Sequence, residues 1–179
     1  MGEPTLASNL GQAIKLAREI LRLPVAILTN SSLMSRQDVR QELAQADLVV
    51  AKLDAPDEEL FQRINHPAGR ISLAEVLEGI KLFGREYPSK LALQLMFMEQ
   101  NRGRAEDLAR LAAEISPLEV QLNTPLRPCP VKPLPPEEMS RIKREFEGLP
   151  TRVVMVYEAS RPEVIPLNLE ETLRRRVKL

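Results

Sequence analysis

The strongest constraint on the fold of this chain is a regular alternation between short apolar runs and helical patterns. In three runs the hydrophobic side chains do not alternate with polar ones, and a fourth strand-like run follows; together they cover residues 25–30, 48–55, 91–98 and 118–125. Runs without alternation are typical of strands buried on both faces, as in a parallel sheet. The sequence therefore predicts an α/β fold, with helices outside a parallel sheet that is either open or curved into an arc of a barrel.

Helical periodicity fills the stretches between the strands. The predicted helices cover residues 9–23, 35–45, 57–65, 72–87 and 105–115. Pro24 ends the first of them, and Ser72 followed by Glu75 forms a capping-box pattern that begins the fourth. Ser35 with Asp38 predicts the same kind of start for the second helix.

The character of the chain changes after Thr124. Residues 124–136, TPLRPCPVKPLPP, contain six prolines, which exclude a helix and predict a stiff, extended connector. We therefore divide the chain into a core of parallel α/β units, residues 1–124, and an extension, residues 125–179. The elements predicted after the connector are a helix over 136–147, a strand over 151–159 and a helix over 167–179.

Charge and cysteine content narrow the classes of function. Lys and Arg together number 25, as do Asp and Glu, so the charge balance does not indicate a nucleic-acid partner or an anionic membrane surface. The basic run 174–176 fits the end of a helix better than a nucleic-acid patch. No apolar run in the sequence is long enough to span a bilayer. The one cysteine, Cys129, excludes an intrachain disulfide or a cysteine-built cluster and points to a reducing cytoplasm.

Polar residues gather where the predicted strands end, at the edge where parallel α/β folds bind ligands. At the ends of the four runs they are Thr29, Asn30, Ser31, Ser32, Lys52, Asp54, Glu99, Gln100, Asn101, Gln121, Asn123 and Thr124, and Gly2, Glu3 and Pro4 at the start of the chain join them. They include no Ser/His/Asp triad, Cys/His pair, phosphate loop or HExxH motif. Structural roles are open as well, because Asn and Ser form turns and Asp54 can cap the next helix. His66 stands alone and is a poor metal ligand, and Cys129 has only Lys132 nearby to activate it as a nucleophile.

Four segments, taken in order, carry a resemblance to a known family. They are GEPTL, residues 2–6; LTNSSLM, 28–34; VVAKLDAPDEELFQRINHP, 49–67; and QLNTPLRP, 121–128. In this order they resemble the radical S-adenosylmethionine (radical SAM) superfamily. The resemblance is closest to its iron–sulfur oxidoreductase branch, related to wyosine-type and glycyl-radical-activating enzymes. VVMVYEASRPEV and ETLRRR fit the C-terminal extension of that branch, so the similarity covers nearly all of the chain.

The resemblance implies a fold, two cofactors and a set of contacts. The fold is a partial (β/α)6 barrel, here residues 1–124 without its first strands, and the complete enzyme holds SAM and a [4Fe-4S] cluster. The resemblance implies that Gly2, Glu3 and Pro4 contact the methionyl amino group of SAM. Thr29 and Asn30 lie at the end of what is the third strand of the complete family barrel. Asp54 lies near the ribose, and Asn123 and Thr124 lie near the adenine. No catalytic residue is assigned.

The chain departs from the family at its start. The family's CxxxCxxC cluster loop precedes GEP, whereas here only Met1 precedes it and Cys129 is the one cysteine, so a cluster is not expected on this chain alone. The resemblance implies that the sequence begins inside a barrel, without the cluster loop. The strand over 25–29 is then an unpaired apolar edge, which favours self-association or pairing with a separate chain that carries the cluster loop.

Three functions follow as hypotheses. The first is the C-terminal part of a radical SAM enzyme that cleaves SAM to a 5′-deoxyadenosyl radical, with this chain supplying SAM and substrate contacts. The alternative is a non-catalytic binding or assembly module derived from that fold. The third is an unrelated (β/α) enzyme in which Lys52, beside Asp54, acts as a base or Schiff-base former.

Overall fold

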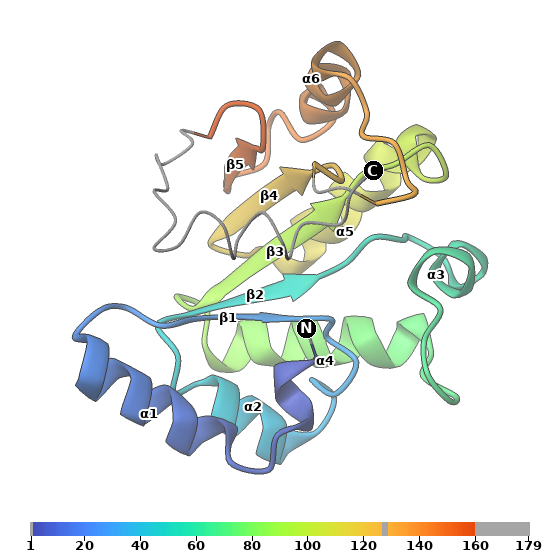
Figure 1. Cartoon of the computed structure of the whole chain (residues 1–179). Coiled ribbons are helices and arrows are strands. Elements are labelled where there is room, and N and C mark those ends of the chain that lie inside the picture. The colour runs from blue at the N-terminus through green and yellow to red at the C-terminus, as the bar shows by residue number, and fades with distance from the viewer. Residues whose placement is uncertain (1, 127–128, 160–179) are drawn as a thin grey trace, which may run out of the picture.

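Five parallel strands in one sheet form the centre of the computed structural model, which describes residues 2–126 and 129–159. The strands are β1 (Ala26–Thr29), β2 (Leu48–Lys52), β3 (Leu91–Met96), β4 (Glu119–Asn123) and β5 (Arg152–Met155). They lie side by side in chain order, and every neighbouring pair is parallel. The predicted α/β class and parallel sheet are confirmed (Figure 1).

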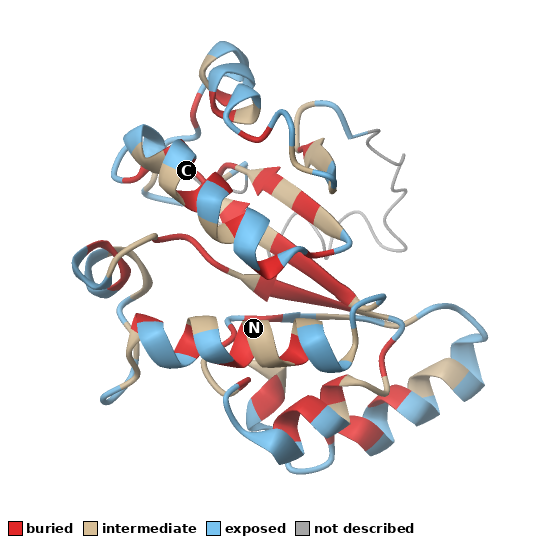
Figure 2. Ribbon diagram, turned by 180° about the vertical axis from the view of Figure 1, so that it is seen from behind, coloured by how far each residue is buried: buried red, intermediate tan, exposed pale blue. Residues whose placement is uncertain are grey.

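Apart from the first helix, which precedes β1, the helices connect successive strands, as parallel pairing requires. They are α1 (Leu10–Leu21), α2 (Gln37–Leu43), α3 (Glu58–Asn65), α4 (Leu73–Glu86), α5 (Ala105–Ile115) and α6 (Pro136–Arg144), with 3-10 turns η1 (Pro4–Leu6) and η2 (Arg102–Arg104). Figures 1 and 2 show α4 and α5 against the same face of the sheet.

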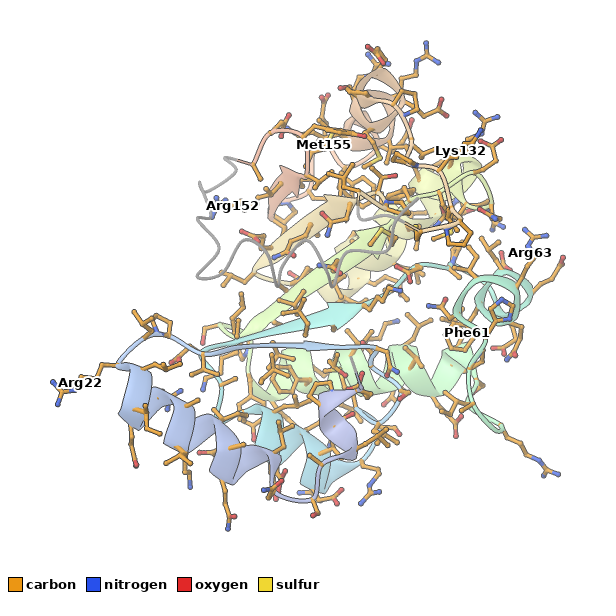
Figure 3. The ribbon with its side chains drawn as sticks, viewed as in Figure 1. Arg22, Phe61, Arg63, Lys132, Arg152 and Met155 are labelled. Atoms are coloured by element: carbon orange, nitrogen blue, oxygen red, sulfur yellow. The ribbon has the colours of Figure 1, made fainter. Side chains whose placement is uncertain are left out.

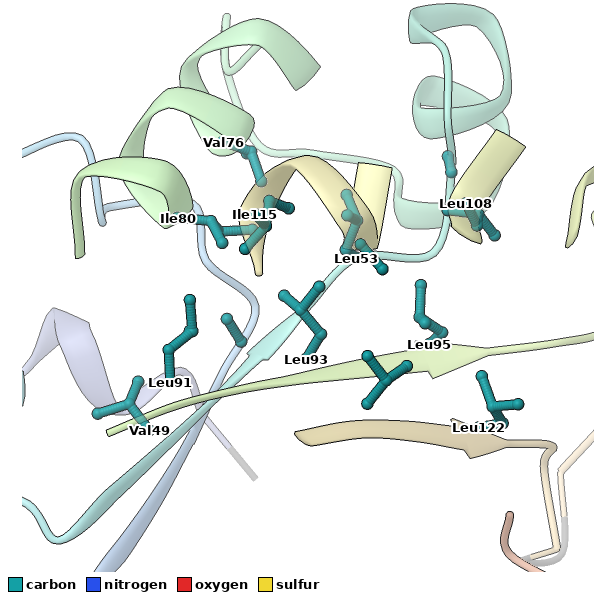
Figure 4. Close-up of a cluster of buried hydrophobic side chains, with 14 of the residues drawn as sticks. Val49, Leu53, Val76, Ile80, Leu91, Leu93, Leu95, Leu108, Ile115 and Leu122 are labelled. Carbon is teal, nitrogen blue, oxygen red and sulfur yellow. The ribbon is translucent and has the colours of Figure 1, made fainter. Parts of the chain in front are cut away.

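The main core lies between that face and the helices. Leu91, Leu93 and Leu95 of β3 are almost completely buried there. Residues of α4 and α5, including Ile80 and Leu108, pack over them (Figure 4). Alternate residues face the helices because successive strand side chains point to opposite sides. The remaining strand residues therefore line the opposite face of the sheet, and several of them are polar.

Local sequence signals determine some helix ends and not others. The capping box at Ser72 and Glu75 is present, with both reciprocal hydrogen bonds. The one predicted at Ser35 and Asp38 is wrong: α2 begins after Arg36 with no side-chain cap. The reason is a competing ion pair, because Asp38 receives two hydrogen bonds from the Arg36 guanidinium.

The sheet continues past Thr124. The predicted strand over 151–159 is present as β5, and it pairs in parallel with β4, with α6 between them in the chain. The division of the chain into residues 1–124 and 125–179 stays a prediction, but the described sheet crosses it. The helix predicted over 167–179, with its basic run, lies outside the described residues.

The first strand forms an edge of the sheet. Within residues 2–126 and 129–159, β1 pairs with β2 alone, as predicted. Leu28 of β1 is 57% exposed, and Leu16 and Ile20 of α1 are also largely exposed. An apolar edge of this kind can pair with another strand. None of the described helices is long and apolar enough to cross a bilayer.

Candidate functional site

The carboxyl ends of the strands form one edge of the molecule. In Figure 3, Phe61, Arg63 and Lys132 lie towards this edge, whereas Arg22 and Arg152 lie at the opposite ends of the strands. The predicted site residues end or closely follow β1, β2 and β4, or lie just before or at the start of η1. Their contacts show which of them the fold brings together.

Glu3 is joined to the end of β1. Its Oε1 atom accepts a 2.6 Å hydrogen bond from the Thr29 hydroxyl, and its Oε2 atom accepts one of 2.7 Å from the Asn30 N–H. The N–H and the hydroxyl of Thr5 also donate to Oε1, at 3.1 and 2.7 Å. Oε1 thus accepts from three protein donors and Oε2 from one, so Oε2 has a lone pair left. Glu3, Thr29 and Asn30 come together as predicted, and the Glu3 carboxylate holds η1 against β1.

Asp54 forms a second junction, at the end of β2. Its side chain has no exposed surface. Oδ1 accepts a 2.9 Å hydrogen bond from the Met96 N–H, while Oδ2 accepts one of 3.0 Å from the Asn65 amide and lies 2.8 Å from the Lys52 ammonium. Asp54 does not cap the next helix, because Asp57 occupies the N-cap of α3. The Asp54 carboxylate thus accepts two hydrogen bonds and forms one ion pair within the protein, and a contact from it to a ribose stays a prediction.

Two further polar residues stabilise the same edge. The buried Asn101 side chain donates to the carbonyls of Asp54 and Met96 at 2.8 and 2.9 Å and accepts from the Met98 N–H at 2.8 Å. The Ser31 hydroxyl donates to the Lys52 carbonyl at 3.1 Å. Every polar atom of the Asn101 side chain has a protein partner, so its role is structural.

Asn123 and Thr124 lie at the end of β4, on the far side of β2 and β3 from Glu3. The Asn123 carbonyl accepts from the Phe97 N–H at 2.7 Å. The buried Thr124 hydroxyl accepts a 2.8 Å hydrogen bond from the Leu134 N–H, which ties the proline-rich connector to the strand end. These two residues do not line the cavity that Glu3, Asn30 and Lys52 share.

That cavity has a volume of about 400 Å³ and is hereafter the strand-end cavity. Its polar lining comes from separate segments of the chain and consists of Glu3, Asn30, Ser32, Lys52, Asn65 and His66. Its apolar wall includes Phe61 and Ile64 of α3 and Ile71 of the following loop. The volume and the mixed lining are typical of a site for a small molecule.

The start of α3, which supports one wall of the cavity, is fixed by Asp57. Its carboxylate accepts a 2.9 Å hydrogen bond from the Leu60 N–H and a 2.6 Å one from Arg104. The Leu60 hydrogen bond, supported by Arg104, lowers the pKa of Asp57 below its ordinary value. At the other end of α3, His66 is exposed and has a left-handed backbone, with φ of 44°.

A row of polar side chains crosses the face of the sheet that points away from α4 and α5. The strand register places Lys52 beside Gln94 and Gln94 beside Gln121. The Gln94 amide donates to Gln121 Oε1 at 3.3 Å. Parallel strands in register place such residues on one face. Sequence reasoning named Lys52 and Gln121 as strand-end residues but missed Gln94, which joins them, although the alternation in residues 119–123 is a signal for such a row.

The residues of this chain do not fit a [4Fe-4S] cluster, whose iron atoms are held by several cysteine thiolates. The single cysteine, Cys129, is exposed and its thiol lies 3.3 Å from the Val131 carbonyl. Across the described part of the chain, no three His, Cys, Asp or Glu side chains are grouped so that they could hold a metal ion.

Solved structures with similar folds are radical SAM enzymes. A radical SAM methyltransferase from Sphaerobacter thermophilus has a TM-score of 0.67 at 18% identity, over 87% of this chain and 48% of that chain. A domain of a pyruvate-formate lyase-activating enzyme from Bacteroides vulgatus has a TM-score of 0.65 at 14% identity, over 87% of this chain and 94% of that chain. This chain has the fold of a partial radical SAM barrel. SuiB of Streptococcus suis bound to S-adenosylmethionine has a TM-score of 0.62 at 15% identity, over 86% of this chain and 37% of that chain.

Sequence relatives include UPF0026 proteins. One from Synechocystis is 38% identical over 148 residues, 82% of this chain and 52% of that protein. One from Methanocaldococcus jannaschii is 35% identical over 146 residues, 80% of this chain and 45% of that protein. The chain therefore spans about half the length of the curated relatives it matches. No family model matches it. That the sequence begins inside a barrel stays a prediction.

Proposed function

We propose that this chain supplies SAM and substrate contacts of a radical SAM iron–sulfur enzyme whose cluster cysteines lie outside this sequence. The observation that carries the proposal is the strand-end cavity, where Glu3, Asn30 and Lys52 meet at the carboxyl edge of a partial radical SAM barrel. The resemblance of fold and the half-length match to the UPF0026 proteins support it.

The role of this chain in such an enzyme is to bind and orient SAM. In the complete enzyme, one electron from the reduced iron–sulfur cluster would cleave SAM to methionine and a 5′-deoxyadenosyl radical. The methionyl ammonium donates to oxygens of the segment Gly2 to Pro4, among them Glu3 Oε2, which accepts a hydrogen bond from the Asn30 N–H alone. By the resemblance, the strand end at Asp54 lies near the ribose, and the end of β4 at Asn123 and Thr124 lies near the adenine.

Binding of SAM to the purified chain tests the proposal. Amide resonances are followed by NMR while SAM is added, with adenosine and methionine as partial ligands. We expect saturable shifts at residues 2–5, 29–31 and 122–124 with SAM. Glu3→Gln should weaken binding because it releases the segment before η1, whereas Glu147→Gln, at an exposed position beyond α6, should not. No shift at these residues at millimolar SAM would contradict the proposal.

The alternative, a non-catalytic binding or assembly module, has its own supporting observation. The exposed edge strand β1 and the 57% exposed Leu28 favour self-association or pairing with a separate chain. Sedimentation velocity of the wild type and of Leu28→Lys tests this, because a charge on an edge strand blocks pairing. Association that Leu28→Lys abolishes, together with absence of SAM binding, would favour the module.

A further inference from the structure

The α3 side of the strand-end cavity has no role in the proposed SAM contacts. None of the residues predicted to contact SAM belongs to α3 or to the loop after it. Nevertheless this side carries Asn65, His66 and an apolar wall of Phe61, Ile64 and Ile71. Its chemistry is therefore informative about a second ligand.

Lys52 provides a positive charge on this side of the cavity. Its ammonium lies 2.8 Å from Asp54 Oδ2, and its side chain is 37% exposed while that of Asp54 is not exposed at all. A lysine ammonium has three N–H donors, and the ion pair with Asp54 does not use all of them. The buried carboxylate thus holds the ammonium at the cavity wall while further donors stay available to a ligand anion.

Asn65 provides an unused acceptor beside that charge. Its Oδ1 atom is buried and has no hydrogen-bond partner. The amide cannot be reversed, because Asp54 Oδ2 accepts a hydrogen bond and the NH₂ group must face it. An unpaired buried acceptor costs about 1–3 kcal/mol, which a ligand donor would recover.

The two groups are close together, because the Lys52 ammonium and the Asn65 amide contact the same atom, Asp54 Oδ2. A ligand that uses both must carry its anion and its N–H or O–H donor on neighbouring atoms. Asp54 already balances the Lys52 ammonium and Glu3 adds a negative charge to the lining, so a singly charged carboxylate is repelled less than a doubly charged phosphate ester. The apolar wall adds a place for an aliphatic group.

We propose that the α3 side of the strand-end cavity binds a carboxylic acid substrate that has an N–H or O–H on the carbon next to the carboxylate and an aliphatic side chain. Lys52 binds the carboxylate, Asn65 Oδ1 accepts the neighbouring donor, and Phe61 and Ile64 contact the aliphatic group. The inference rests on the proposed function in treating the acid as a second ligand that binds beside SAM.

Three small probes test the chemistry on the unmodified protein. They are N-acetyl-L-leucine, which has every feature; N-acetyl-L-leucinamide, which lacks the charge; and 4-methylpentanoate, which lacks the donor. We expect N-acetyl-L-leucine to shift the amide resonances of residues 61–68 saturably. The affinity of either analogue should be about tenfold lower, as for loss of a charge-assisted or buried hydrogen bond. Equal affinities for the three probes, or no saturable shift with the first, would overturn the proposal.

Variants test the assignment to Lys52. Lys52→Gln should weaken binding of N-acetyl-L-leucine but not of its amide, Lys52→Arg should retain binding, and Lys15→Gln, at an exposed position on α1, should have no effect. Thermal unfolding checks that each variant folds. The comparison of the three probes uses the unmodified protein and does not depend on the variants. Unchanged binding in a folded Lys52→Gln protein would overturn the assignment.

Competition with SAM separates this inference from the proposed function. We expect SAM and N-acetyl-L-leucine to bind together. Displacement of the acid by SAM would overturn the inference and assign the cavity to SAM alone. Binding of the acid without any binding of SAM would support an acid site and contradict the proposed SAM function.

Discussion

Thr29 donates a 2.6 Å hydrogen bond to Glu3 Oε1, and this contact joins two residues that are 26 positions apart in the chain. It fixes the segment before η1 against the end of β1. The Asn30 N–H donates to the other carboxylate oxygen, so both sides of the carboxylate are used. One edge of the strand-end cavity therefore depends on a single acidic side chain.

Glu3→Gln should loosen this junction. A glutamine has one oxygen where the carboxylate has two, so it cannot accept from both Thr29 and Asn30 without placing its NH₂ group against a donor. We expect the Asn30 amide to exchange with deuterium about tenfold faster, in line with the loss of a hydrogen bond to a charged group. Glu147→Gln is the matched control. Unaltered exchange at Asn30 would show that the carboxylate does not hold the segment.

Asp54→Ala should destabilise the fold strongly. The substitution leaves the Met96 N–H, the Asn65 amide and the Lys52 ammonium without their partner. Removing one member of a buried ion pair costs about 3–5 kcal/mol, and the free energy of unfolding in urea should fall by about the lower value. Asp38→Ala, in a 65% exposed side chain, should change it far less. Equal effects of the two substitutions would contradict the account of Asp54 as a junction.

The ion pair of Arg40 and Glu86 should make stability depend on pH. The Arg40 guanidinium donates two 2.9 Å hydrogen bonds to the Glu86 carboxylate and holds its pKa below the ordinary value of 4.5. Because the pKa is lower in the folded state, the stabilisation is complete above pH 4.5 and is lost as the pH falls through the lowered value.

The wild type and Glu86→Gln should therefore differ more in free energy of unfolding at neutral pH than in acid. Urea unfolding across the pH range measures the difference. In an Arg40→Met background the same glutamine substitution should show little of this pH dependence. A difference that grows as the pH falls would have the wrong sign for this mechanism.

Gly79→Ala should distort the contact between α4 and the segment before α2. A Cβ atom at this position would overlap the Ser35 backbone nitrogen and lie 2.5 Å from the Met34 carbonyl carbon. Backbone atoms cannot move aside cheaply, so we expect a loss of about 3 kcal/mol in the free energy of unfolding. Gly103→Ala, where a Cβ meets nothing within 4 Å, is the control. A Gly79→Ala protein as stable as the control would show that the contact can relax.

Much of the fold was predictable from local patterns. The four predicted core strands and the five predicted helices agree with the structure, because apolar periodicity reports which face of an element is buried. The first of these strands lies at the edge of the sheet, as predicted. Element ends were less predictable. The cap expected at Ser35 is absent because Arg36 takes the Asp38 side chain.

The candidate site was predictable as a location rather than as a set of roles. Glu3, Thr29, Asn30 and Lys52 were predicted as candidate site residues from their expected positions at the edge where the strands end. Asn65, which carries the buried unpaired acceptor, lies in a helical pattern with nothing local to distinguish it.

The sequence by itself determined the parallel α/β architecture and the edge at which polar residues collect, because both follow from periodicities of a few residues. Only the tertiary structure decided that the carboxylates of Glu3 and Asp54 are occupied by protein donors, and that Lys52 and Asn65 meet at one oxygen atom. These contacts join residues from 2 to 42 positions apart, and they exist because parallel strands carry distant segments to the same edge.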